Sequence, residues 1–118
     1  MSGLVADPDC LFCKIVAGDI PVEMVSETEH TVAFRDVNPQ APTHVLVIPR
    51  RHEPDITSLA GVDPEATIAL LAETRRIAAT EGAGSYRLVF NTGVDAGQTV
   101  FHCHAHVLAG RSLGWPPG

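Results

Sequence analysis

The run Val45-Leu46-Val47-Ile48, within "HVLVIP", constrains the fold more than any other segment of the chain. Four consecutive apolar residues in extended conformation place side chains on both faces of a strand, so other elements must cover both faces. A chain of 118 residues with 45% apolar composition is large enough to bury such a strand in one core. We therefore expect residues 1–118 to form a single domain with this strand at its centre and with residues 1–9 flexible.

A long helix is expected after Asp63. Asp63 suits the N-cap, Pro64 suits the first helical position, and Gly82 and Gly84 are expected to end the helix. Residues at helical spacing form one stripe suited to burial, namely Thr67, Leu70, Leu71, Thr74, Ile77 and Ala78, and the residues expected on the opposite face are Glu65, Glu73 and Arg76.

Shorter patterns complete the predicted architecture. "DCLFCKIVAGD" indicates a short helix capped by Asp9 and ending near Gly18, and "VEMVSET" with "TVAFRDV" indicates a hairpin. "YRLVFN" and "TVFHCHAHVLAG" indicate strands on either side of the loop "TGVDAG". The prediction is an α+β fold with a mainly antiparallel sheet of about five strands, one long helix and a short N-terminal helix.

Three histidines alternate in the last predicted strand, at His102, His104 and His106. Side chains two residues apart on a strand lie on the same face, so the three imidazoles are expected to converge. They are suited to binding a divalent metal, or to a relay in which one nitrogen attacks a substrate while its neighbours fix its tautomer and transfer protons. A polar strand face in contact with solvent is the third interpretation, and the spacing by itself leaves all three open.

The loop before these histidines contains Gly93, Gly97, Gln98 and Thr99. Glycines allow backbone N–H groups to approach an anion, and Gln98 and Thr99 add side-chain donors. An ordinary hairpin loop explains the glycines equally well. Next to three histidines, however, the loop favours a phosphate site in which an imidazole attacks phosphorus while N–H donors stabilise the non-bridging oxygens.

Charge and cysteine content exclude several classes of protein. The net charge of -6 argues against binding to nucleic acid or to an acidic membrane surface. The start of the chain lacks a basic stretch followed by a long apolar run, and no later segment resembles a membrane span. Three cysteines cannot all pair within the chain, which favours a reducing compartment. A cytoplasmic location without a membrane or nucleic-acid partner is therefore expected.

The chain resembles the histidine triad nucleotide-binding proteins. "HCHAHVL" matches the His-x-His-x-His-x-x signature of that family, and the similarity runs from about Cys10 to the C-terminus. Within the family, "FRDVNPQAPTHVLVIPRRH", "NTGVDAGQTVFHCHAHVLAGR" and the final "WPPG" resemble the branch that hydrolyses nucleoside phosphoramidates.

This resemblance implies a homodimer that cleaves the P–N bond of purine nucleoside 5'-phosphoramidates, such as an adenylate joined to an amine or to lysine. His104 is expected to attack the α-phosphorus and form a nucleotidyl-histidine, His106 to contact the phosphate and assist proton transfer, and His44 to orient His104 through a hydrogen bond. The expected nucleotide-binding residues are Asp36 for the ribose, Asn91, Gly97, Gln98 and Thr99 for the phosphate, Phe12, Ile15, Ile20 and Leu46 for the base, and Trp115 reaching towards the partner's site.

The resemblance also divides the three histidines between two tasks. In similar bacterial proteins, two cysteines, a histidine after the "VIPRR" strand and the first triad histidine bind structural zinc, and here these are Cys10, Cys13, His52 and His102. A single Cys-x-x-Cys pair is weak evidence for a metal by itself, and buried, inert cysteines are the competing interpretation.

Other functions remain open at this point. The same nucleophile suits a dinucleoside polyphosphate hydrolase or another nucleotidyl transferase. A non-catalytic adaptor would bind AMP without turnover. A metal hydrolase would use all three triad histidines to hold the metal. Thr99 stands where the phosphoramidase branch usually has serine, which keeps the hydroxyl but adds a methyl group near the phosphate.

Overall fold

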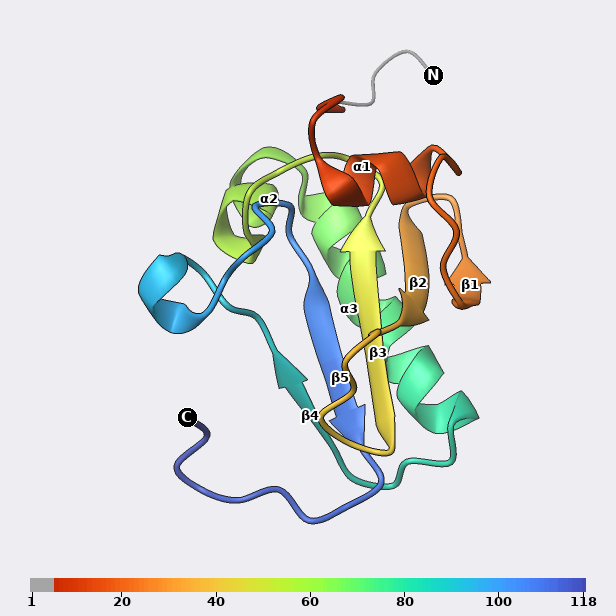
Figure 1. The fold of residues 1–118 in the computed structure, drawn as a ribbon, viewed down its shortest axis with the longest axis vertical. Coiled ribbons are helices and arrows are strands. Elements are labelled where there is room, and N and C mark those ends of the chain that lie inside the picture. Colours follow the sequence, from red (N-terminus) through yellow and green to blue (C-terminus); the bar gives the residue numbers. More distant parts are fainter. Residues whose placement is uncertain (1–5) are drawn as a thin grey trace.

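The computed structural model describes residues 6–118, and this part of the chain contains one five-stranded antiparallel sheet with helices packed against it (Figure 1). The strands are β1 (Met24–Glu27), β2 (Thr31–Arg35), β3 (Thr43–Pro49), β4 (Tyr86–Val89) and β5 (Ala105–Ala109). The α-helices are α1 (Leu11–Val16), α2 (Ile56–Val62) and α3 (Pro64–Thr80), and a 3-10 helix, η1, spans Val94–Ala96. The predicted α+β class is confirmed. Flexibility is expected of residues 1–9, of which residues 1–5 lie outside the described part of the chain.

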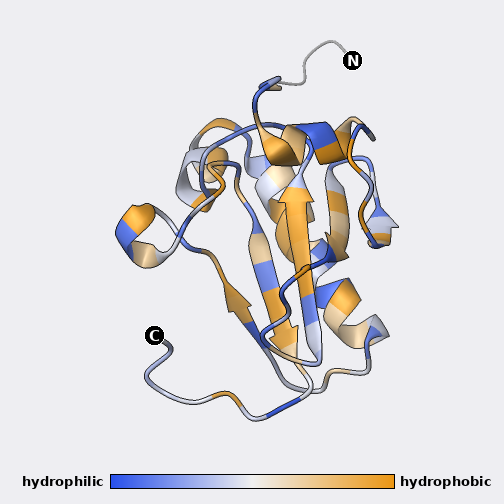
Figure 2. Ribbon diagram, in the orientation of Figure 1, coloured by the Kyte–Doolittle hydropathy of each residue, from blue (hydrophilic) through white to orange (hydrophobic). Residues whose placement is uncertain are grey.

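The strand order β1-β2-β3-β5-β4 places β3 at the centre, as its apolar run predicts. Val45 and Val47 join the buried cluster that contains the apolar residues of α3, whereas Leu46 and Ile48 join a second cluster that contains Phe12 of α1. Because successive side chains alternate across a strand, these two clusters lie on opposite faces of the sheet. In Figure 2, β3 is largely apolar, while β5 has a polar band among apolar ones.

The long helix begins at its predicted cap, because Asp63 Oδ1 accepts a hydrogen bond from the backbone N–H of Ala66 at 3.0 Å. The expected position of Glu73 on the solvent side is wrong, since only 6% of this residue is exposed. Its carboxylate accepts hydrogen bonds from Ser26 Oγ of β1 at 2.6 Å and from Arg76 Nε at 2.7 Å. A buried carboxylate is tolerated here because both of its oxygens are paired.

Two further details of the helices differ from the prediction. The seven-residue helix α2 was not predicted, because only Leu59 on it is buried and one buried position gives no helical periodicity. Asp55 caps it by accepting from Ser58 N–H at 2.8 Å. The first helix is capped by Cys10 and not by Asp9, because Cys10 Sγ accepts from Cys13 N–H at 3.4 Å. Among the described residues, no helix has both the length and the apolar composition needed to cross a membrane.

The last strand is shorter than predicted and begins only at Ala105. His102 and His104 therefore precede the strand, and His106 is the one triad histidine within it. The backbone N–H of Cys103 donates to the carbonyl of Glu53 at 2.7 Å, so this segment is hydrogen-bonded to a loop and not to a neighbouring strand. His106 pairs with Leu46 of β3, which places it on the face of the sheet that α1 covers.

Candidate active site and metal-binding cluster

A pocket of about 360 Å³ lies beside α1 and exposes two of the three triad histidines, His104 and His106. Its wall is largely apolar, and every residue expected to contact a base lines it: Phe12, Ile15, Ile20 and Leu46. Asp36 and Thr99 also line the pocket. The structure thus brings the predicted base, ribose and nucleophile positions together around one cavity.

His104 is held with one ring nitrogen free. Its Nδ1 lies 2.8 Å from the backbone carbonyl of His102, which can only accept, so Nδ1 carries the proton and Nε2 has the lone pair. Phe12 packs edge-to-face with this ring, with centroids 5.0 Å apart and planes at 90°. His104 is 8% exposed, so the carbonyl and the aromatic ring together fix its tautomer and its orientation.

His44 contacts His106 and not His104, which corrects the expected hydrogen bond. The backbone N–H of Gln40 donates to His44 Nδ1 at 3.0 Å, so the proton of the neutral ring is on Nε2. His44 Nε2 lies 3.0 Å from His106 Nδ1 and donates to it. The proton of neutral His106 is consequently on Nε2, which is buried and has no hydrogen-bond partner within residues 6–118.

The antiparallel register explains why these two rings meet. His44 pairs with Leu108 and His106 pairs with Leu46, so the two histidines occupy diagonal positions on the same face of β3 and β5. Side chains at such diagonal positions are within reach of each other when they are long. The expected bond from His44 to His104 is not formed, because His104 precedes the last strand and lies four residues before Leu108, the residue paired with His44.

Asp36 follows the last residue of β2, where it lines the pocket and also faces the hydrogen-bonded pair His44 and His106, called the relay below. Its Oδ1 accepts from Asn38 N–H at 2.8 Å, and its Oδ2 lies 3.4 Å from His44 Nε2. The carboxylate is therefore positioned both for a ligand in the pocket and for electrostatic interaction with His44.

Burial keeps the histidines of the pocket neutral near pH 7. Desolvation lowers the pKa values of His44 and His104; the Asp36 carboxylate opposes the shift at both rings, and the hydrogen bond to the His102 carbonyl opposes it more strongly at His104. The pKa of His106 is lowered to about 4, first by burial and then by its proximity to His104 and His44, while Asp36 again opposes the shift. A neutral His104 retains the lone pair that a nucleophile requires.

Asp36, His44 and His106 also place three potential ligand atoms within 4.8 Å of one another. A metal on His44 Nε2 would require the proton of that ring to be on Nδ1, where Gln40 N–H already donates. The hydrogen-bond pattern therefore favours proton transfer over metal binding for this group.

The loop expected to bind phosphate uses several of its donors internally. The N–H groups of Gly97 and Gln98 donate to the carbonyls of Val94 and Gly93, at 3.0 and 3.1 Å. The side-chain amide of Gln98 donates to Pro54 O at 2.6 Å and to Val100 O at 3.1 Å. These two residues thus shape the loop.

Gly97 has φ of +95°, a left-handed conformation that favours glycine, and it lies beside the side-chain amide of Asn91. Among the expected phosphate residues, only Thr99 lines the pocket. Trp115 is 83% exposed and does not line it either.

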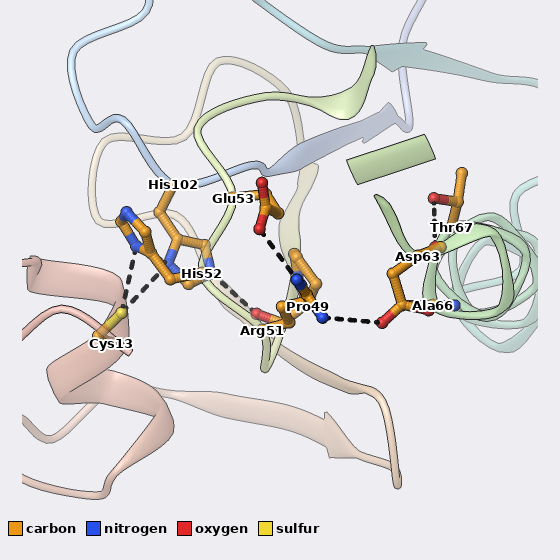
Figure 3. A network of polar contacts seen from close by, with 9 residues as sticks. All are labelled: Cys13, Pro49, Arg51, His52, Glu53, Asp63, Ala66, Thr67 and His102. Carbon is orange, nitrogen blue, oxygen red and sulfur yellow. Dashed lines mark hydrogen bonds and ion pairs between the residues drawn. The ribbon is translucent and has the colours of Figure 1, made fainter. Parts of the chain in front are cut away.

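A second group of side chains lies at the start of α1. Cys10, Cys13, His52 and His102 place one potential ligand atom each within 4.8 Å of one another, so this group can hold a metal ion. Figure 3 shows Cys13, His52 and His102 turned towards one another. The structure therefore brings together the four residues that the sequence resemblance assigns to zinc.

The hydrogen bonds of His102 suit a metal ligand. Its Nε2 lies 2.8 Å from the carbonyl of Pro49, so Nε2 carries the proton and Nδ1 has the lone pair. That Nδ1 is 3.5 Å from Cys10 Sγ, 3.5 Å from Cys13 Sγ and 3.2 Å from His52 Nδ1. The single lone pair of Nδ1 cannot form hydrogen bonds with three such neighbours at once, whereas a cation at the centre of the group would be coordinated by all four atoms.

Sequence reasoning missed three backbone groups that set these tautomers: the carbonyls of Pro49 and His102 and the N–H of Gln40. Every residue has a carbonyl and nearly every residue has an N–H, so no residue type signals which of them will contact a histidine. Only the tertiary fold makes that choice.

Comparison with known proteins places the chain in a family. The model of the HIT domain matches residues 17–113. An uncharacterized HIT-like protein of Synechocystis is 45% identical over 111 residues, covering 93% of this chain and 97% of that protein. Protein pkiA of Dictyostelium discoideum is 42% identical, with 95% of this chain and 92% of that protein covered.

Solved structures agree with this assignment. A HIT family hydrolase from Legionella pneumophila has a TM-score of 0.89 and 46% identity, covering 93% of this chain and all of that one. A histidine triad nucleotide-binding protein from Candida albicans has a TM-score of 0.77 and 29% identity, covering 92% and 83%. The fold and the paired histidines define the class of histidine triad domains. This chain belongs to the HIT domain family.

Proposed function

We propose that the protein is a hydrolase that cleaves the P–N bond of purine nucleoside 5'-phosphoramidates. The names of related structures support the general class, because they include HIT family hydrolases and a nucleotide-binding protein. The observation that carries the proposal is the pair of tautomers in one pocket. His104 offers a lone pair on Nε2, and His106 offers an unpartnered Nε2–H beside it.

These two nitrogens suit a two-step displacement at phosphorus. Nε2 of His104 attacks the α-phosphorus and forms an N–P bond, while the P–N bond to the leaving amine breaks. The amine leaves with its bonding electron pair and takes up a proton. The negative phosphate raises the proton affinity of the relay, so the His44–His106 pair takes up one proton from solvent when substrate binds, and His106 then transfers a proton to the leaving amine. Water then attacks the phosphorus and gives a proton to the neutral relay, the His104–phosphorus bond breaks with its electron pair returning to Nε2 of His104, and the nucleotide is released.

The pocket offers matching contacts for the rest of the nucleotide. The apolar wall beside Phe12 and Leu46 accepts a flat base, and the Asp36 carboxylate accepts hydrogen bonds from ribose hydroxyls. Asn91 and the Thr99 hydroxyl are the proposed phosphate donors. Gly97 and Gln98 act by shaping the loop that presents them, since their own donors are engaged.

We also propose that Cys10, Cys13, His52 and His102 bind structural zinc. Tetrahedral zinc with Zn–N of about 2.0 Å and Zn–S of about 2.3 Å separates its donor atoms by about 3.3 to 3.8 Å. His102 Nδ1 lies 3.2 to 3.5 Å from the ligand atoms of the other three residues, and Cys13 Sγ lies 3.3 Å from His52 Nδ1. Burial raises the pKa of the Cys13 thiol, so a bound cation would supply the charge that stabilises its thiolate. Zinc would anchor α1 to the segment before β5.

A homodimer is part of the same proposal. Ile68 and Leu71 on α3 and Tyr86 on the edge strand β4 are 69%, 42% and 41% exposed, and a partner subunit would cover such apolar side chains. In this arrangement Trp115 reaches the partner's pocket. Light scattering during gel filtration gives the mass that tests this state.

Hydrolysis of a fluorogenic adenosine phosphoramidate tests the activity. His104→Ala is expected to lower kcat/KM by about 10³-fold or more while AMP binding persists. Brief mixing of the wild type with substrate should yield an adenylated protein by mass spectrometry, and this species should be absent in His104→Ala. Unchanged hydrolysis in the variant would refute the assigned nucleophile. Binding of AMP without turnover in the wild type would identify an adaptor instead.

A substrate panel separates the remaining enzymes. Dinucleoside polyphosphates should be cleaved with lower kcat/KM than phosphoramidates, and the reverse order would favour the polyphosphate hydrolase. Turnover should continue immediately after a chelator is added, because zinc does not enter the covalent step. Immediate loss would favour a metal hydrolase.

A further inference from the structure

Arg111 connects the turn after β5 to the loop between β2 and β3, residues 36–42. Its Nε and Nη2 donate to the backbone carbonyl of Gln40, at 3.2 and 2.9 Å, across 71 positions in the sequence. Its Nη1 donates to the carbonyl of Ser112 at 2.9 Å, which fixes the orientation of the guanidinium. Two donors on one carbonyl hold its position better than a single bond would.

Gln40 is also the residue that sets the tautomer of His44. Its backbone N–H donates to His44 Nδ1, and its side-chain amide donates to the carbonyl of Asn38 at 3.0 Å. Asn38 N–H in turn donates to Asp36. The loop therefore carries both the Asp36 carboxylate proposed to bind ribose and the Gln40 N–H that sets the tautomer of His44. Arg111 holds this loop through hydrogen bonds on its solvent-exposed side.

The neighbouring glycine makes a second contact with the same loop. Gly110 has φ of +95°, and a Cβ added to it would lie 2.8 Å from Cβ of Pro42. The turn and the loop are thus packed against each other without space for a side chain. Arg111 itself is exposed and does not line the nucleotide pocket, so any effect it has on chemistry must pass through this loop.

We infer that Arg111 is a positioning residue for the His44–His106 relay, an inference that rests on the proposed function for its kinetic consequence. The Arg111 fork holds Gln40 so that its N–H keeps the proton of His44 on Nε2. If the loop shifts, His44 can carry its proton on Nδ1, and two lone pairs then face each other at His44 Nε2 and His106 Nδ1. His106 must move its own proton to Nδ1 to restore the bond, which removes the Nε2–H donor from the pocket.

Nitrogen NMR of histidine-labelled protein tests this inference without substrate. In the wild type, the two-bond correlations of His44 and His106 should both report a proton on Nε2. In Arg111→Met, a substantial share of His44 should report a proton on Nδ1, and Arg111→Lys should restore part of the wild-type pattern by offering one ammonium donor. Arg50→Met is the matched control, because Arg50 Nε also holds a backbone carbonyl, that of Thr28 at 2.8 Å, far from the relay.

Kinetics supply the second readout. Arg111→Met should lower kcat for an adenosine phosphoramidate by about 10-fold or more, with KM and AMP affinity changed little, whereas Arg50→Met should match the wild type. Wild-type tautomers together with wild-type kcat in Arg111→Met would overturn the inference, as would an equal loss in Arg50→Met. If the wild type lacks phosphoramidase activity, the proposed function fails, and the NMR comparison still decides the role of Arg111. If Arg111→Met does not fold, Arg111→Lys provides the comparison. The inference would be refuted if the crystal structure of Arg111→Lys lacked the contact with Gln40 while its tautomers and its kcat matched those of the wild type.

Discussion

His102 donates its Nε2–H to Pro49, and its backbone carbonyl accepts the Nδ1–H of His104. One residue therefore belongs both to the candidate metal cluster through its side chain and to the nucleophile through its main chain. The position of His104 consequently depends on whatever holds the ring of His102, which connects the stability of the cluster to the chemistry of the pocket.

Zinc should be present and should stabilise the fold. We expect about one zinc per chain in protein purified without chelators, and Cys13→Ser should lose it and lower Tm by about 10 °C or more, because the site connects α1 to the segment before β5. Metal analysis and thermal unfolding measure both effects. Cys103→Ala is the control. Cys103 is buried in the core beside α3 and is not one of the four proposed ligands, so this variant should keep its zinc. Zinc-free wild type with unchanged Tm in Cys13→Ser would rule out the site.

Acid should destabilise the protein through His106. Its pKa is about 4 in the folded state against 6.5 when unperturbed, so the unfolded chain binds more protons between these values and stability falls as pH drops from about 6.5 to about 4. The groups around it, His44, His104 and Asp36, remain in His106→Gln. Chemical denaturation at several pH values should show a shallower slope in this variant, by up to about 1.4 kcal/mol per pH unit. An identical slope would contradict the assignment.

Glu73 should stabilise the contact between α3 and β1. Glu73→Ala removes the acceptor of Ser26 and leaves Arg76 unpaired, and we expect a loss of about 2 kcal/mol in the free energy of unfolding. Glu65→Ala is the control, because that side chain is 84% exposed and its loss should cost less than about 0.5 kcal/mol. Hydrogen bonds from Arg76, aided by Ser26, lower the pKa of Glu73 below 4.5. Its contribution should therefore be present above pH 4.5 and disappear as the pH falls further, and equal costs for the two variants would refute it.

Gly110→Ala should be destabilising, because the new Cβ meets Pro42 and the backbone at this position is left-handed. We expect a cost of about 1 to 3 kcal/mol. Gly84→Ala serves as the comparison, since nothing lies within 4 Å of its added Cβ and its φ is not in the left-handed range. Urea denaturation of both variants measures the difference, and a neutral Gly110→Ala would show that the turn is free to move.

The apolar patterns predicted most of the fold. Val45 to Ile48 predicted a strand covered on both faces, and the stripe after Asp63 predicted one face of a long helix. The prediction was wrong for Glu73, because a charge is assigned to solvent unless its partners are known, and Ser26 comes from a distant strand. It also extended the last strand too far, since no pattern in "FHCH" shows that Cys103 N–H bonds to Glu53.

The sequence by itself determined the residue types of the pocket and the cluster, and their family signature, because these depend on side-chain chemistry and spacing along the chain. Only the tertiary structure decided which ring each histidine contacts and which nitrogen carries its proton. His44 meets His106 because the register of β3 and β5 makes them diagonal neighbours. The carbonyl of His102 sets the tautomer of His104, and the N–H of Gln40 sets that of His44 and through it that of His106. Nearly every peptide unit has these two groups, so only folding decides which of them contacts a particular imidazole.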